Sequence, residues 1–289
     1  MRFALFALAA FAAACSTPPA SAPDASPVVA AERAFAAEAG RSGWVEAFLT
    51  HSTDQAIVIG ARPRNAHEAM QRIPPANRGD TSLTWGPTFA GISRGGDIGF
   101  TTGPFSGGGT VFGQYFTVWR KQPDGAWKWI YDGGTNQRTP VTVDANAEVV
   151  QIEVGARGAG SAAAAIDAVR LREETLAQAA ASNAGTAFSR VMAEHGRMNR
   201  DDQPSAVGPR AAAQLVGQGA IGYSPPQIVE AGTAGDLVFT LGEARWEGGS
   251  GYYCRIWVLQ RDGWKIAFDQ ILQRPLDQAP AQEVVPPAP

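Results

Sequence analysis

Hydrophobic residues recur along the chain with two different periods, and the change of period separates helical stretches from extended ones. An Ala-rich stretch from Val29 to Ala39 ends at Gly40, which predicts a first helix. Trp44, Ala47 and Phe48 then recur at helical spacing. The chain is therefore expected to begin its folded part with helices.

Further helices are predicted by capping and by apolar spacing. Asn65, followed three residues later by Glu68, resembles a capping box and predicts a short helix to Arg72. A long helix is predicted from Ile166 to Ala181. One face of a following helix is predicted to carry Phe188, Val191, Met192 and His195.

Extended segments follow each group of helices. Ile98–Thr102 and Val238–Leu241 are rich in β-forming residues. Each is followed by a pair of strands joined at an Asp-Gly turn, a strong hairpin signal. These pairs are Tyr115–Arg120 with Trp127–Tyr131, and Tyr253–Leu259 with Trp264–Phe268. Helices followed by an antiparallel sheet predict an α+β fold.

The same order of motifs occurs twice. Gly96-Asp97 corresponds to Gly235-Asp236, and equally ordered matches follow at an offset that drifts only from 139 to 137 residues: Trp119 with Trp257, Asp124-Gly125 with Asp262-Gly263, Trp127 with Trp264, and Asp132 with Asp269. A repeat of this kind predicts two copies of one domain, at 29–136 and 162–275, joined by a connector at 137–161.

The repeated pattern resembles the nuclear transport factor 2-like superfamily, in the branch of SnoaL-like cyclases, ketosteroid isomerase and many bacterial domains of unknown function. The motif Asp262-Gly263-Trp264-Lys265-Ile266 carries the resemblance, and Asp124-Gly125-Ala126-Trp127-Lys128 matches it with one inserted residue. The resemblance implies a cone, in which a strongly curved sheet wraps around helices and leaves a pocket at its open end. It also implies pairing through the sheets, so that the two copies would form an internal pseudo-dimer.

The N-terminal residues have the pattern of a targeting signal. Phe3–Ala14 is apolar but too short to span a bilayer, as in a signal peptide. It ends in Ala12-Ala13-Ala14-Cys15, which resembles a bacterial lipobox and implies cleavage before Cys15 and lipidation of this residue. Segment 1–15 is thus the predicted signal with its lipid-bearing cysteine, 16–28 a tether rich in Pro, Ser and Ala, and 276–289 a Pro-rich tail.

These features predict a protein held at the bacterial cell envelope by lipid and facing the periplasm. Ser16 after the cysteine favours the outer membrane, by resemblance to Gram-negative lipoproteins. Loss of residues 1–14 removes one basic residue and no acidic one, so the net charge would change from −3 to −4. Membrane contact is therefore expected through the lipid alone, and no nucleic-acid partner is expected. With two cysteines and three histidines, neither a disulfide framework nor a metal site is expected, and no cofactor is predicted.

Candidate ligand-binding residues lie on the long strands. Period two places Tyr253, Arg255 and Trp257 on one strand face, and Tyr115, Thr117 and Trp119 on the equivalent face of the first copy. If this face lines the cone, Arg255 would anchor an anionic group; if it faces the other copy, Arg255 would form an interface ion pair. Cys254 points to the opposite face and is expected in the core.

Three residues are weak candidates for acid–base catalysis: His195, Asp269 and Glu243. Asp269 and its counterpart Asp132 end the last strand of each copy, where either would serve as a pocket carboxylate. Strict alternation, however, places them on the same faces as Lys265 and Lys128, which predicts that they face water. Glu243 is expected to pair with Arg245 or Arg255.

Three functions stay open at this point. The favoured one is a non-catalytic module that binds a small apolar or anionic molecule, or a protein partner. The second is an isomerase, cyclase or hydratase acting on a small apolar substrate; the carboxylate base, Tyr and protonated Asp of ketosteroid isomerase chemistry do not map onto either copy, which counts against it. The third is a structural envelope lipoprotein.

Overall fold

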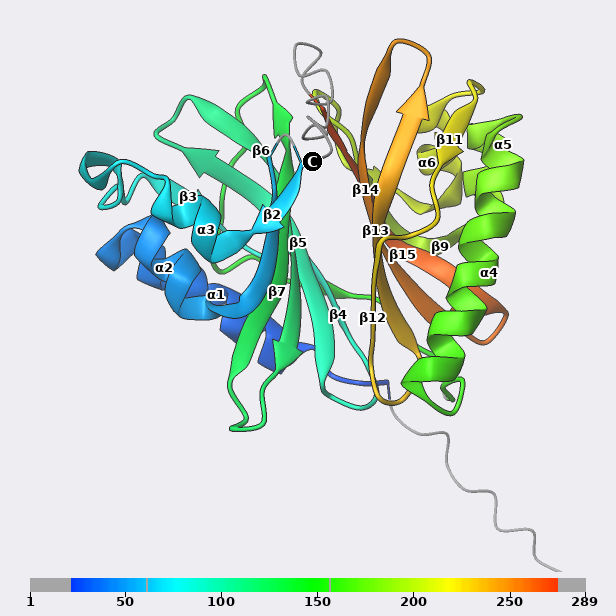
Figure 1. Cartoon of the computed structure of the whole chain (residues 1–289), viewed down its shortest axis with the longest axis horizontal. Coiled ribbons are helices and arrows are strands. Elements are labelled where there is room, and N and C mark those ends of the chain that lie inside the picture. Colours follow the sequence, from blue (N-terminus) through cyan, green and yellow to red (C-terminus); the bar gives the residue numbers. More distant parts are fainter. Residues whose placement is uncertain (1–21, 61, 156, 275–289) are drawn as a thin grey trace, which may run out of the picture.

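The computed structural model describes residues 22–60, 62–155 and 157–274, and these form two units of helices and sheet (Figure 1). Unit one begins with two helices and builds one sheet with strand order β2-β1-β7-β6-β5-β4-β8, in which β3 also pairs with β5. Its helices are α1 (Ser26–Ser42), α2 (Trp44–His51) and α3 (Ala66–Gln71), and its strands are β1 (Ser52–Ile59), β2 (Pro63–Asn65), β3 (Leu83–Trp85), β4 (Phe89–Ile92), β5 (Ile98–Gly107), β6 (Val111–Lys121), β7 (Trp127–Gln137) and β8 (Val150–Gln151).

Unit two repeats this order with strand order β10-β9-β15-β14-β13-β11, and β12 also pairs with β13. Its elements are α4 (Ala162–Ala180), α5 (Ala184–Val191), β9 (Met192–Asn199), β10 (Ala206–Val207), α6 (Gly208–Val216), β11 (Ile221–Tyr223), β12 (Ile228–Ala231), β13 (Leu237–Trp246), β14 (Gly249–Gln260) and β15 (Gly263–Gln273). The predicted α+β class with two tandem units is confirmed.

The two long hairpins form where the Asp-Gly pairs predict them. Gly125 and Gly263 have φ angles of +88° and +111°, a region that glycine enters without steric cost. In each hairpin the register shifts by one residue, between Val118 and Trp119 in β6–β7 and between Ile256 and Trp257 in β14–β15. These β-bulges change which residues of β7 and β15 face the helices.

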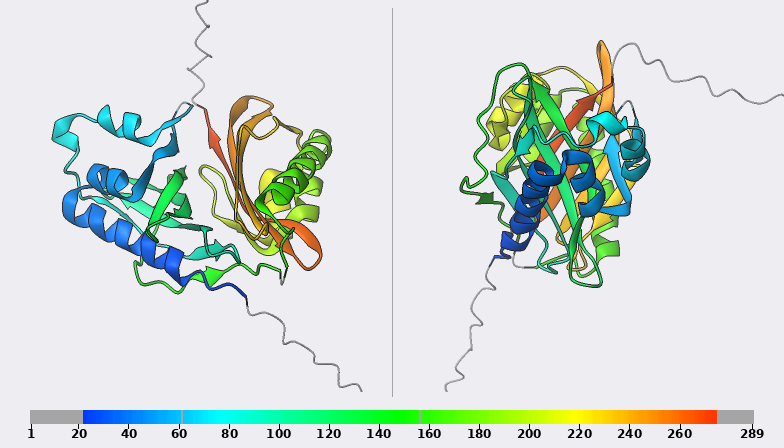
Figure 2. Two further views of the ribbon diagram at one scale, coloured as in Figure 1. Left: turned by 60° about the horizontal axis from the view of Figure 1, so that its bottom comes forward. Right: turned by 90° about the vertical axis from the view of Figure 1, so that its left-hand side faces the viewer.

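The two sheets lie against each other, and the helices cover their outer faces (Figures 1 and 2). The Phe116 and Phe268 rings stack across this interface with centroids 4.0 Å apart. The Cys254 thiol of unit two donates a hydrogen bond to the Tyr131 hydroxyl of unit one, at 3.0 Å. A shared core of buried residues from both sheets therefore lies between two further cores, one inside each unit.

Three local features differ from the sequence-based expectations. α1 begins at Ser26, inside the predicted tether, because Pro27 suits the first helical turn and Val28 is fully buried. β8, inside the predicted connector, pairs in parallel with β4. His195 lies on strand β9 and is exposed, since the helix before it already ends at Val191; its prediction on an apolar helix face was wrong.

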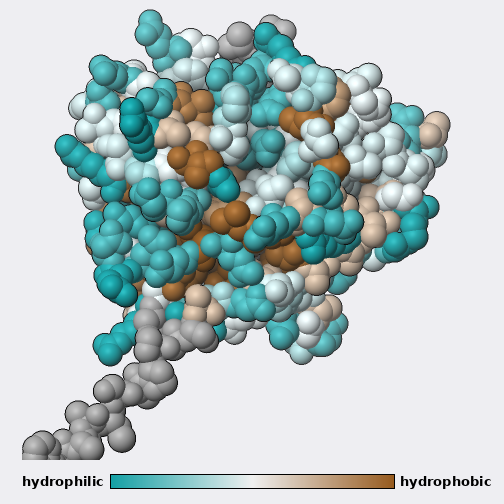
Figure 3. All heavy atoms as spheres, turned by 180° about the vertical axis from the view of Figure 1, so that it is seen from behind, coloured by the Kyte–Doolittle hydropathy of each residue, from teal (hydrophilic) through white to brown (hydrophobic). Residues whose placement is uncertain are grey.

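The outer surface is mainly hydrophilic. Seen from behind, hydrophobic residues reach it in separate small areas near the middle of the face (Figure 3). Scattered apolar residues of this kind are normal for a globular protein and do not by themselves indicate a docking surface. No helix in the described ranges is long and apolar enough to cross a membrane.

Candidate functional site

A buried glutamate from the first helix of each unit lies in the space between the helices and the sheet of that unit, which is called the cone from here on. Glu32 of α1 accepts hydrogen bonds from the indoles of Trp85, at 2.6 Å, and Trp119, at 3.0 Å, and from the hydroxyl of Thr101. Its side chain is inaccessible to solvent. A carboxyl group held in this way lies on the inner face of the sheet.

Glu173 of α4 makes the equivalent contacts in unit two. It accepts from the Thr240 hydroxyl at 2.7 Å and from the Trp257 indole at 2.8 Å. Thr240 and Trp257 correspond to Thr101 and Trp119 by the offset of the sequence repeat. The two cones therefore share a common set of polar groups at their centre.

A second carboxylate enters each cone from the last strand, Asp132 from β7 and Asp269 from β15. The β-bulges reverse the expected alternation, so neither aspartate faces water with the lysine four residues before it. Asp269 is completely buried, and Asp132 lines a cavity. The prediction that both face solvent was wrong, because an extra residue in a strand inverts every later side chain.

In unit two, Arg255 neutralises both carboxylates. Its Nε lies 2.6 Å from Asp269 Oδ2, and its Nη1 lies 2.5 Å from Glu173 Oε2. Arg200 adds a second ion pair to Asp269, at 2.6 Å. The guanidinium of Arg255 is fully buried, so this side chain occupies the centre of the cone instead of being free to anchor a ligand.

In unit one, Thr117 holds the place of Arg255. Thr117 pairs with Thr101 and Asp132 across the sheet, and Arg255 pairs with Thr240 and Asp269 in the same register. The Thr117 hydroxyl donates to Asp132 Oδ2 at 2.7 Å. Within the described part of the chain, neither Glu32 nor Asp132 is in an ion pair.

The pKa values of Glu32 and Asp132 are both raised. Burial raises the pKa of Asp132 well above its usual 3.8, although the hydrogen bond from Thr117 opposes this and the nearby Glu32 adds to it. Burial likewise raises the pKa of Glu32, against the hydrogen bonds it accepts. Both pKa values are thus shifted in the direction that favours the neutral form.

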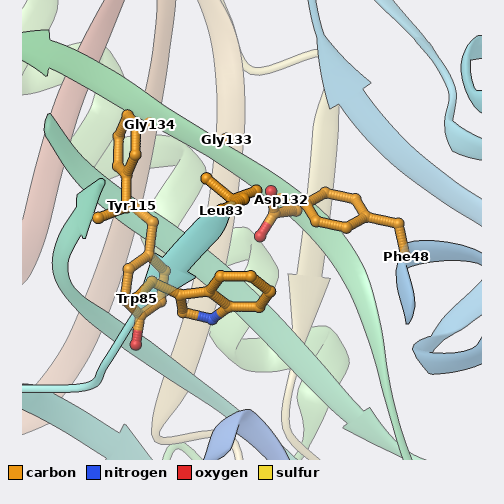
Figure 4. Close-up of a pocket in the computed structure, with 8 residues that line it drawn as sticks. Phe48, Leu83, Trp85, Tyr115, Asp132, Gly133 and Gly134 are labelled. Carbon is orange, nitrogen blue, oxygen red and sulfur yellow. The ribbon is translucent and has the colours of Figure 1, made fainter. Parts of the chain in front are cut away.

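A cavity of about 170 Å³ opens beside Asp132 (Figure 4). Figure 4 shows the Asp132 carboxyl group between the ring of Phe48 and the other lining side chains. The lining is otherwise almost entirely apolar and comes from α2, β3, β5, β6 and β7: Phe48, Leu83, Trp85, Phe105, Tyr115, Asp132, Gly133 and Gly134. The Tyr115 hydroxyl is buried without a hydrogen-bond partner. An apolar space with two polar groups is the usual composition of a ligand site.

The remaining predicted residues have structural contacts. The Tyr253 hydroxyl donates to the Ser224 carbonyl at 3.1 Å. Glu243 pairs with Arg245 at 3.3 Å, not with Arg255. Cys254 is buried at the interface between the units, and Cys15 lies outside the described residues.

The sequence analysis missed both buried glutamates, although the sequence carries a signal for them. Glu32 lies four residues after Val28 and three before Phe35, and Glu173 has the same spacing to Val169 and Leu176. A carboxylate on the apolar stripe of an amphipathic helix must be satisfied inside the protein, which marks it as a site residue. In residues 22–60, 62–155 and 157–274, no cluster of three metal-ligating side chains is present.

No protein-family model and no curated protein matches the chain significantly. Solved structures do match parts of it. An NTF2-like protein with a cystatin-like fold from Novosphingobium aromaticivorans is 16% identical, with a TM-score of 0.32, over 39% of this chain and 83% of its own. An NTF2-like protein of unknown function from Pseudomonas putida is 17% identical, with a TM-score of 0.32, over 39% and 88%. A domain of unknown function with a cystatin-like fold from Nostoc punctiforme is 14% identical, with a TM-score of 0.33, over 37% and 75%.

Proposed function

We propose that the protein is a non-catalytic binding module whose unit one holds a small molecule in the cavity beside Asp132. The contrast between the two units carries this proposal. The same register position bears a small Thr117 where the cavity is open and a long Arg255 where the cone is filled. Unit two therefore serves as the rigid half of the body, and unit one as the half that receives a ligand.

The size and polarity of the cavity limit what it accepts. An apolar cavity of about 150 Å³ holds a molecule of benzene size. A space of about 170 Å³ therefore suits a single ring or an aliphatic group of similar volume. Asp132 requires a polar group on this ligand, because a carboxyl group buried against a ligand needs a hydrogen-bond partner.

The experiment compares the full wild-type chain with Thr117→Arg. Ligand-observed nuclear magnetic resonance is recorded with eight single-ring compounds that include phenol, benzamide, benzamidine and benzoate. At least one should bind with a Kd below about 1 mM and lose this binding in Thr117→Arg, because the new side chain fills the cavity as Arg255 does in unit two. Thr84→Arg adds the same charge at an exposed position of the same unit and should bind normally.

The proposal fails if no compound binds, or if binding to Thr117→Arg equals binding to the wild type. Folding of both arginine variants is checked by circular dichroism, so that a misfolded variant is not mistaken for a filled cavity. The wild-type measurement alone decides the proposal if Thr117→Arg does not fold.

We also propose that a lipid on Cys15 tethers this module to the bacterial envelope, facing the periplasm. The apolar segment before Cys15 and the Pro-rich residues after it support this assignment. Metabolic labelling with a fatty acid should mark the wild-type chain and leave Cys15→Ser unmarked. Equal labelling of the two chains, or no labelling of either, contradicts the anchor.

A further inference from the structure

Unit two encloses the guanidinium group of its own Arg255 between aromatic rings and carboxylates. The guanidinium carbon lies 4.1 Å from the ring centroid of Tyr223, 4.2 Å from that of Tyr253 and 5.5 Å from that of Phe188. The two carboxylates described above complete the enclosure. Aromatic faces and carboxylates together are the groups that recognise an organic cation.

Unit one repeats the aromatic walls of this enclosure. Phe48 is the fifth residue of the eight-residue helix α2, as Phe188 is of α5. Tyr115 corresponds to Tyr253, since each pairs with the equivalent glycine of the preceding strand. These pairs differ by 140 and 138 residues, within one residue of the 137–139 offset of the repeat.

The third wall and both carboxylates are repeated as well. Trp85 ends β3 opposite Phe105, and Tyr223 ends β11 opposite Ala244, the equivalent position of the neighbouring strand. Glu32 and Asp132 take the places of Glu173 and Asp269. Unit one thus has each wall of the enclosure, while Thr117 supplies no cation.

The space left by this difference is the cavity of unit one. Three of its lining residues, Phe48, Trp85 and Tyr115, are the aromatic walls, and Asp132 is one of the two carboxyl groups. Tyr115 is only 6% exposed, and its hydroxyl points at no partner within the described chain. The cavity thus brings three aromatic rings together with Asp132, which has no ion pair in the described part of the chain, whereas the equivalent Asp269 is paired with Arg255.

We propose that the ligand of unit one is a small organic cation of guanidinium or amidinium type with an apolar body, which takes the place that the Arg255 side chain takes in unit two. This inference rests on the cavity assigned above as the binding site and adds the charge of its ligand. It replaces the expected anionic ligand, because Arg255 is already paired and the open site offers carboxyl groups instead. A planar cation donates hydrogen bonds to Asp132 while its faces lie against the aromatic walls.

Burial supports the same conclusion. In the absence of a cation it raises the pKa of both Asp132 and Glu32. In unit two Arg255 compensates the burial of the equivalent carboxylates, and a cation beside Asp132 would offset the same cost in unit one.

The test compares benzamidine with benzamide, which has nearly the same size and shape but no charge. Calorimetric titration of the full chain should give at least tenfold tighter binding of benzamidine. Thr117→Arg should abolish benzamidine binding, and Asp132→Asn should weaken it at least tenfold. Thr84→Arg is the matched control with the same added charge and should bind benzamidine as the wild type does.

Each outcome separates this inference from the proposed function. If benzamide or phenol binds as tightly as benzamidine and loses binding in Thr117→Arg, the cavity is a ligand site but its ligand is not a cation. If benzamidine binds Thr117→Arg as it binds the wild type, it sits elsewhere and the inference is wrong. If no single-ring compound binds, both the inference and the proposed function fail. The comparison of the two compounds on the wild type decides the inference even if a variant does not fold.

Discussion

Asp236 of unit two accepts the backbone N–H of Arg94 in unit one, at 3.0 Å, and the Ser93 hydroxyl at 2.6 Å. Asp97, its counterpart in unit one, accepts the backbone N–H of Thr233 in unit two at 2.9 Å. Each unit therefore stabilises the same turn of the other. This reciprocity is the pattern of an isologous contact between two copies of one domain.

Asp236 is expected to contribute more than Asp97 to the free energy of unfolding. Asp236 is completely buried and satisfies two donors, so Asp236→Ala leaves both of them unpaired and should lower the free energy of unfolding by about 2–3 kcal/mol. Asp97 is half-buried and satisfies one donor, so Asp97→Ala should lower it by about 1 kcal/mol or less. Urea unfolding followed by circular dichroism measures both. Equal losses contradict this ranking, and Asp167→Ala, at an exposed position of α4, is the control.

Arg255 should be essential for the stability of unit two. Arg255→Met keeps most of the volume but leaves Glu173 and Asp269 buried without this cation, which should lower the free energy of unfolding by about 3–5 kcal/mol at pH 7. Urea unfolding followed by circular dichroism measures this loss.

Arg245→Met is the matched control, because the Arg245 side chain is 75% exposed in its pair with Glu243. Its effect should stay below about 0.5 kcal/mol. An Arg255→Met variant as stable as this control contradicts the assigned role of Arg255.

The sequence was sufficient to predict what depends on local chemistry. Asp-Gly turns located both long hairpins, and the repeat matched Trp119 with Trp257, whose indoles bind equivalent glutamates. Alternation also placed Thr117 and Arg255 correctly on equivalent faces of their strands. These features need no knowledge of distant contacts.

What depends on an interruption of a regular element was not predicted. Alternation places the Asp132 and Lys128 side chains on the same face only if β7 is regular. The bulge after Trp129 interrupts this regularity. The helix before His195 ends at Val191 because Met192 is already extended and pairs with Ile266 of β15. Both features are fixed by partners far away in the sequence, which a local pattern does not contain.

Asp132 should give the protein a measurable pH dependence. Because its pKa in the folded chain lies well above 3.8, the folded state holds a proton that the unfolded state releases between these two values. The free energy of unfolding therefore falls as the pH rises from about 4 towards the folded pKa. Asp132→Asn removes this contribution and should flatten the curve, gaining stability relative to the wild type as the pH rises. Urea unfolding from pH 4.5 to 8 measures the slope; exposed Asp124→Asn should leave it unchanged, and an unchanged slope in Asp132→Asn contradicts the prediction.

Cys254 should be unreactive in the folded protein. Burial raises the pKa of its thiol to about 12. At pH 8 only about one thiol in 10,000 would then be the reactive thiolate, and the side chain is inaccessible as well.

In a Cys15→Ser chain, Cys254 is the remaining cysteine. A maleimide should label it after denaturation but not before, whereas an added exposed cysteine, Thr110→Cys, should be labelled at once. Labelling of folded Cys254 at the rate of that control would mean that the two sheets separate readily, which the shared core between the units argues against.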